Sequence, residues 1–170
     1  MQYQFRQSIS WSKISSSVAS FKVKKAGTMF DVAGLSLFVN NEDDYYYLLA
    51  LCNSRYAEEC LDFLSPTLNY ETGHIASIPV IKSEEYKASI NKLSNLNVFI
   101  SQQDWDSFET SWDFQRHPLL RNVSTIAEAF TQWQAECDER FNQLKANEEE
   151  LNRIFIDIYA LQDELTPEVE

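Results

Sequence analysis

The chain has few of the residues that interrupt helices. Its 170 residues include only three glycines and four prolines, and every glycine lies before residue 74. Because glycine and proline end helices and form turns, we expect long, uninterrupted helices in the second half. Apolar residues make up 44% of the chain, which is enough for a packed core.

Membrane and secretion signals are also missing. No apolar run is long enough to span a bilayer, and the first twelve residues are too polar for a secretory signal. Cys52, Cys60 and Cys137 are odd in number, lack CxxC spacing and lie at apolar positions of helical patterns. We interpret them as reduced core thiols of a cytoplasmic protein that makes no membrane contact.

Catalytic motifs are missing as well. The sequence has no Asn-Pro-Pro-aromatic or Asp-Pro-Pro-aromatic motif to hold the amine of a flipped base, no glycine-rich turn for S-adenosylmethionine or a nucleotide, and no P-loop. His74 and His117 are isolated, so we interpret both as structural. We therefore expect no catalytic residue, no metal ligand and no bound cofactor in this chain.

The charge is strongly negative but unevenly distributed. A net charge of −12 argues against a free-standing DNA-binding protein, because phosphate contacts need a basic face. Residues 1–40, however, hold five basic residues and one acidic residue, a local charge of +4. This asymmetry suggests that the first segment faces nucleic acid, whereas the structural alternative is a sheet edge protected by lysines.

Short alternating stretches predict strands near the N-terminus. Residues 21–24 alternate apolar and basic side chains, so Lys22 and Lys24 share one face. Residues 29–32 and 35–39 predict two further strands, and residues 11–17 predict a polar loop anchored by its indole. Lysines and small hydroxyl groups suit phosphate and base-edge contacts. The candidate DNA-binding residues are Lys13, Ser15, Ser16, Lys22, Lys24 and Lys25.

The remaining chain reads as helix. An acidic start predicts one helix over 44–64, with one ring of the tyrosine run 45–47 in the core and two at its rim. Ser83 is expected to cap a second helix. A capping box at Thr125 predicts a third helix that reaches Leu161, with a bend near 147–150.

An acidic and aromatic run occupies residues 104–114. We expect its rings at positions 105, 108 and 112 to hold a short helix against neighbouring helices, while the acids stay in water. A divalent metal bound by its carboxylates is the alternative, but no histidine or further ligand set accompanies them.

These patterns predict an α+β fold in which a small mixed or antiparallel sheet with a packed helix precedes a helical region. The apolar period changes near Pro79, which suggests a division into residues 1–81 and residues 82–170, the latter ending in a long helix.

The chain resembles the adenine-specific DNA methyltransferases of BREX phage-defence systems, often described as type II restriction–modification enzymes. The first half is similar to the closing part of their target-recognition domain, and the second half to their helical region. The matching segments are 11–16, 30–34, 51–54, 66–70, 104–114, 147–155, 158–161 and 164–169. One difference is Tyr159-Ala160-Leu161, where the family commonly has Tyr-Gly-Leu; Ala160 is expected to extend the helix.

The resemblance implies a C-terminal-region fragment, with Met1 an artificial or accidental start. Residues 1–81 would be the C-terminal half of a DNA target-recognition domain. The parent enzyme would methylate adenine N6, using S-adenosylmethionine and a methyltransferase domain upstream, and would bind double-stranded DNA. The fragment itself would not be an enzyme. The alternative is a docking module without DNA contact, which binds the methyltransferase body or another defence-system protein.

Overall fold

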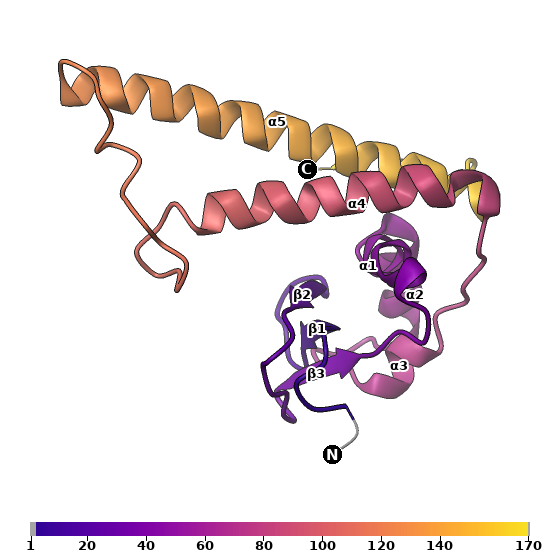
Figure 1. Cartoon of the computed structure of the whole chain (residues 1–170). Helices are drawn as coiled ribbons and strands as arrows, with labels where there is room; N and C mark the ends of the chain where they lie inside the picture. The colour runs from indigo at the N-terminus through magenta and orange to yellow at the C-terminus, as the bar shows by residue number, and fades with distance from the viewer. Residues whose placement is uncertain (1–2, 170) are drawn as a thin grey trace.

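The computed structural model describes residues 3–169 and arranges them in three layers: a small sheet, a pair of short helices, and a long helical hairpin (Figure 1). The strands are β1 (Ser8–Ser12), β2 (Lys22–Lys24) and β3 (Gly34–Leu37). After a short 3-10 helix at Glu42–Asp44, the helices are α1 (Tyr45–Cys52), α2 (Arg55–Leu64), α3 (Thr72–Ala76), α4 (Glu84–Trp105) and α5 (Ile126–Ile158). The α+β class expected from the sequence is confirmed.

The sheet is antiparallel, with β1 between β2 and β3. Ser8 pairs with Lys24 and Ser10 with Lys22, while Trp11 pairs with Leu35 on the other side. Because side chains alternate along a strand, Ile9 and Trp11 point to one face and the serines to the other. Ile9 and Trp11 are buried, so the sheet has one core face and one polar face.

Helix α1 forms the middle layer. Its sequence, YYYLLALC, has no charged side chain, and six of its eight residues are buried. A helix that is apolar all round has to be covered on all sides. Tyr45 donates its hydroxyl hydrogen to the carbonyl oxygen of Ser8 in β1, at 2.9 Å, whereas Tyr47 donates to Ile81 and packs edge-on against Phe155 of α5. The sheet covers one side of α1 and the hairpin covers the other.

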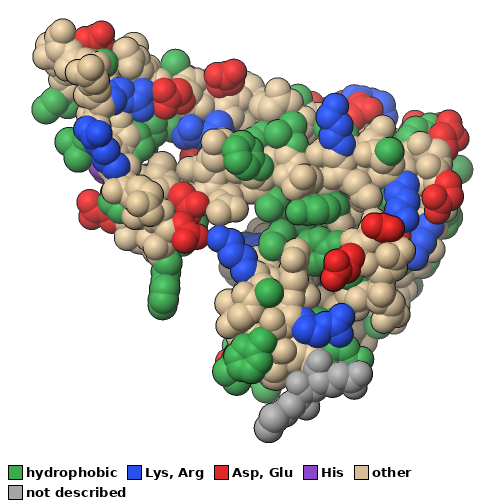
Figure 2. All heavy atoms as spheres, in the orientation of Figure 1, with side chains coloured by type: hydrophobic (Ala, Val, Ile, Leu, Met, Phe, Trp, Pro, Cys, Tyr) green, Lys and Arg blue, Asp and Glu red, His purple; other side chains and the backbone are tan. Residues whose placement is uncertain are grey.

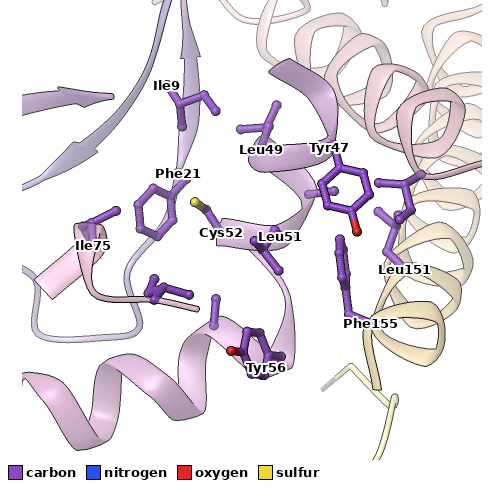
Figure 3. Close-up of a cluster of buried hydrophobic side chains, with 14 of the residues drawn as sticks. Ile9, Phe21, Tyr47, Leu49, Leu51, Cys52, Tyr56, Ile75, Leu151 and Phe155 are labelled. Carbon is purple, nitrogen blue, oxygen red and sulfur yellow. The ribbon is translucent and has the colours of Figure 1, made fainter. Parts of the chain in front are cut away.

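Helices α4 and α5 run side by side as an antiparallel hairpin, and its near end shares the core with α1 (Figure 1). The close-up shows Ile9 and Phe21 on one side of α1, and Leu151 and Phe155 on the other (Figure 3). One cluster of buried side chains therefore includes residues from before and after position 82. The division into units at residues 81 and 82 stays a prediction.

The single helix expected over 44–64 is wrong in one respect, because Asn53 and Ser54 divide it into α1 and α2. The Asn53 amide pairs with the backbone of Phe21 through two hydrogen bonds of 3.0 Å each, one accepted by Oδ1 and one donated by Nδ2. Ser54 Oγ accepts from Ala57 N and caps α2. Side-chain hydrogen bonds to the backbone thus end one helix and start the next.

Two expectations about the strands are wrong. Trp11 and Ser12 belong to β1, because Ser8–Ser12 alternates polar and apolar residues, although the indole is buried as expected. Residues 29–32 form no strand, since Asp31 Oδ1 accepts from the backbone N–H groups of Ala33 and Gly34, both at 2.9 Å. That double hydrogen bond makes a turn before β3.

The tyrosine run and the acidic run also differ from expectation. Tyr45 and Tyr47 are both buried and only Tyr46 is half-buried, because α1 is covered on two sides. Residues 106–124 form turns, bends and irregular segments, not a short helix. Trp112 is fully exposed, with a relative exposure of 102%, and Trp105 is 57% exposed. With only two helices at this end, these rings have no third surface to pack against.

The caps of the two long helices are confirmed. Ser83 Oγ accepts from Tyr86 N, and Thr125 Oγ1 accepts from Glu128 N at 3.1 Å. Helix α5 runs 33 residues without the expected bend at 147–150. Instead, the buried Asn147 amide donates to Asn97 Oδ1 of α4 at 2.8 Å, a polar contact inside the hairpin.

The expected effect of Ala160 is wrong. This residue has φ +54°, and α5 ends before it. Leu161 N donates to the Ile156 carbonyl at 3.0 Å and Ala160 N to that of Asp157 at 3.2 Å, the pattern of a Schellman C-cap. Such a cap needs a left-handed residue, which alanine adopts only at a cost of about 1 kcal/mol.

Replacing Ala160 with glycine should therefore stabilise the chain by about 1 kcal/mol and raise the melting temperature by about 2–4 °C. The matched control is Ala146→Gly at an exposed position inside α5, which should lower stability by about 1 kcal/mol. Thermal unfolding of both variants provides the test. Equal destabilisation by the two glycines would contradict the C-cap assignment.

An ionic cluster ties the start of α1 to α4. Asp44, only 6% exposed, contacts Lys82 Nζ at 2.5 Å and Lys87 Nζ at 2.9 Å. Hydrogen bonds from Lys82 and then from Lys87 lower the pKa of the Asp44 carboxyl below its usual value. A carboxyl with a lowered pKa stabilises the fold above its unfolded pKa, and this contribution is lost as the pH falls through the folded pKa.

We predict that Asp44→Asn lowers the free energy of unfolding at pH 7 by about 1–2 kcal/mol, because the charged hydrogen bonds are weakened. The difference from wild type should shrink as the pH falls from about 4, the usual pKa of an aspartate in the unfolded chain, through the lowered pKa of the folded carboxyl. Urea unfolding of variant and wild type at pH 7 and below about pH 4 measures this difference in the free energy of unfolding. The control is Asp43→Asn, at the neighbouring exposed position. The same deficit at both pH values would show that the charge is not responsible.

Candidate nucleic-acid interface

The polar face of the sheet gathers serines and lysines from all three strands. The strand register places Lys22 beside Ser10 and Lys24 beside Ser8, with Ser36 of β3 on the other side of Ser10. Lys22 is exposed and Lys24 half-buried. We call this surface the serine–lysine face; it consists of Ser8, Ser10, Ser12, Lys22, Lys24 and Ser36.

Hydrogen bonds position several of these hydroxyl groups. Ser10 Oγ donates to the Leu35 carbonyl at 2.8 Å, and Ser8 Oγ donates to Ser36 Oγ at 3.3 Å. Ser8 is buried, whereas Ser12 is exposed at the end of β1. The exposed part of the face therefore offers hydroxyl groups next to ammonium groups, a combination that suits phosphate oxygens.

Aromatic rings adjoin the serine–lysine face where β3 ends. Lys24 Nζ lies 5.6 Å from the centre of the Phe30 ring, and that ring lies 5.4 Å from Phe38. The Arg6 guanidinium lies over Tyr3 and Phe38, at 5.6 and 6.0 Å from the ring centres. Basic groups with neighbouring aromatic faces are what stacking on exposed bases requires.

Lys25 is held by the connection between α4 and α5. Its Nζ lies 2.9 Å from Asp113 Oδ2, and both side chains are more than 60% exposed. A hydrogen bond with Asp113 and its charge raise the pKa of Lys25 above its usual value. An ion pair this exposed contributes little to stability, so a phosphate can compete for the lysine.

The other three candidates lie elsewhere. Lys13 follows β1 and pairs with Glu71 at 2.9 Å, at the start of α3. Ser15 donates its backbone N–H to the Leu68 carbonyl, and its hydroxyl oxygen accepts from the backbone N–H of Ser17. Ser16, between them, is exposed. The structure thus divides the six candidates into a β2 group on or next to the serine–lysine face and a loop group that packs on residues 68–71.

The serines of β1 and the group around Arg6 are not among the candidates predicted from the sequence. The alternation of Ser8–Ser12 would have identified those serines, because it is the period of a half-buried strand. Nothing in the sequence pairs Tyr3 and Phe30 with Phe38, since that contact depends on how three separate segments meet.

Carboxylates of the acidic run 104–114 bind other side chains of the same chain. Asp104 pairs with Arg140 at 3.4 Å, and Asp106 accepts from Ser111 Oγ at 2.5 Å. Elsewhere, burial raises the pKa of the Cys52 thiol to about 12, which keeps it protonated. Over residues 3–169, none of the helices combines the length and the apolar character needed to cross a bilayer.

Sequence comparison identifies relatives of the whole chain. Adenine-specific methyltransferase PglX of Lacticaseibacillus casei (strain Zhang) is 44% identical over 174 residues, which is 99% of this chain and 14% of that protein. Adenine-specific methyltransferase BrxX of Escherichia coli O9:H4 (strain HS) is 30% identical over 168 residues, covering 98% of this chain and 14% of the relative. No protein-family model matches.

The chain therefore spans about one seventh of the length of these relatives. The resemblance read from the sequence is confirmed, and the chain is related along nearly its whole length to one segment of the PglX and BrxX adenine-specific methyltransferases.

Proposed function

We propose that this chain is the DNA target-recognition and helical part of a site-specific adenine-N6 methyltransferase of a phage-defence or restriction–modification system. Its serine–lysine face would lie against duplex DNA. The main support is that face itself: Lys22 and Lys24 lie beside serines on the polar side of a sheet, in a segment of charge +4 within a chain of −12. The methyltransferase relatives support the enzyme class.

In this proposal, catalysis belongs to other parts of the methyltransferase. S-adenosylmethionine and the catalytic motifs would lie in a methyltransferase domain upstream, in the cytoplasm, and this chain would orient the DNA. Lys22, Lys24 and Lys25 would neutralise phosphates, while the loop with Lys13, Ser15 and Ser16 would reach base edges. The Arg6 cluster would stack on a base that leaves the duplex.

Phosphate contact predicts a specific salt dependence. Each lysine that neutralises a phosphate adds about 0.9 to the slope of log K against log salt, so the triple change Lys22→Ala, Lys24→Ala and Lys25→Ala should flatten the slope by about 2–3. Binding of the chain to a labelled duplex, measured by fluorescence anisotropy from about 20 mM salt upward, gives that slope. Affinity should fall alike for different sequences.

The loop provides the comparison. Ser15→Ala with Ser16→Ala should change the preference among sequences and leave the salt slope as it is. An unchanged slope in the triple-lysine variant would rule out phosphate contact. If that variant also aggregates, the lysines protect the edge of β2, which is the structural alternative.

The pair between Lys25 and Asp113 gives an independent prediction. Asp113→Asn removes the charge that competes with phosphate, so DNA binding should strengthen about two- to threefold at low salt. The control is Glu109→Gln, an exposed charge on the same connection. An equal gain in both variants would indicate general repulsion from an acidic chain, and no gain in either would argue that Lys25 does not meet DNA.

A further inference from the structure

The far half of the α4–α5 hairpin lacks a covering layer. Between Ala129 and Asn147, a stretch that the structure describes completely, no side chain of α5 is buried. Two helices alone cannot bury both of their apolar faces, because each face needs a neighbour on more than one side. The large apolar side chains left at least 37% exposed are Leu96, Phe99, Trp105, Phe108, Trp112, Leu120, Ile126, Phe130 and Phe141.

Part of this surface is hollowed. A groove of about 600 Å³ lies between the two helices, and Ile100, Trp105, Phe108, Phe141 and Leu144 supply its apolar lining. In the space-filling view, hydrophobic side chains are exposed at the hairpin end farthest from the sheet, and one projects freely below it (Figure 2). An exposed apolar patch bordered by polar residues is typical of a protein-binding surface.

The groove lies in an acidic part of the chain, and its charged lining residues, Asp104, Asp138 and Arg140, sum to −1. Residues 95–145 contain eight acidic and four basic residues, a net charge of −4. Three of the four bases are already paired: Arg121 with Glu136, Arg140 with Asp104, and Lys145 with Glu149. Asp138 lines the groove and makes no ion pair within residues 3–169.

We infer that this groove binds an amphipathic helix of a partner protein, with apolar side chains on one face and lysine or arginine on its borders. The part of α5 without buried residues, 130–146, spans 17 residues, so a helix of about 25 Å would cover it. Charge selects this occupant. A second copy would bring a second acidic region against the first, and DNA phosphates would meet the same repulsion.

This inference is independent of DNA binding by the sheet, because the groove and the serine–lysine face share no residue. Apolar burial provides the affinity, and the acidic region selects basic partners and sets their orientation.

The test uses two synthetic peptides of about 18 residues, one with leucine on one helical face and lysine elsewhere, and a twin with glutamate in place of lysine. Calorimetry on the complete 170-residue chain should show micromolar binding of the lysine peptide and at least about tenfold weaker binding of its twin. An excess of duplex DNA should not displace the peptide.

Two groove variants and two controls locate the binding. Phe141→Glu and Asp138→Lys change exposed residues of the groove, and each should weaken the lysine peptide at least about tenfold. Phe63→Glu and Glu59→Lys make the same exchanges at exposed positions of α2 and should leave affinity within about twofold. Circular dichroism checks that all four variants are folded.

Three results would overturn the inference: no binding of the lysine peptide at about 100 μM, equal binding of both peptides, or groove variants that bind like wild type. Sedimentation provides one more. A wild-type dimer that Phe141→Glu converts to monomer would assign the groove to a second copy of the chain.

Discussion

The fold depends on helix α1, which has no charged face that could lie in water. Helix α1 carries eight residues without a charge, and burying a large aliphatic or aromatic side chain contributes about 1.5–3 kcal/mol. That gain is available only if both sides of α1 are covered. The sheet, through Ile9 and Phe21, covers one side, and the hairpin, through Leu151 and Phe155, covers the other.

This arrangement decides which surfaces remain for binding. The sheet uses its apolar face against α1, so its serine–lysine face points outward. The hairpin uses only its near end against α1, and its far half extends beyond the core, since α5 is about 50 Å long. Two surfaces of different chemistry, one basic and one acidic and apolar, are therefore left outside one shared core. The Asp113–Lys25 pair joins the connection between α4 and α5 to the residue that follows β2.

Local patterns predicted the fold class, the caps at Ser83 and Thr125, and the strand at Lys22–Lys24, because each depends on neighbouring residues. The break at Asn53 could not be read from periodicity, since the apolar positions continue across it and the Asn53 amide instead pairs with Phe21, 32 residues away. The prediction that Ala160 extends the helix rested on helix propensity, which favours alanine. The C-cap instead requires a left-handed residue at this position. In the candidate interface, the two β2 lysines that share a face were predictable from alternation, whereas the meeting of Arg6 with Tyr3 and Phe38 depends on tertiary packing.

The most direct test of this account asks whether α1 joins the sheet and the hairpin into one cooperative unit. Leu51 is 1% exposed in the last turn of α1, and Leu51→Ala should remove about 2–5 kcal/mol of stability. Hydrogen–deuterium exchange followed by mass spectrometry compares β1 with residues 151–156 of α5 in the variant and the wild type. Exchange of the slowest amides in both segments should rise by the same factor. Faster exchange in only one of them would show that the sheet and the hairpin are stable independently of each other.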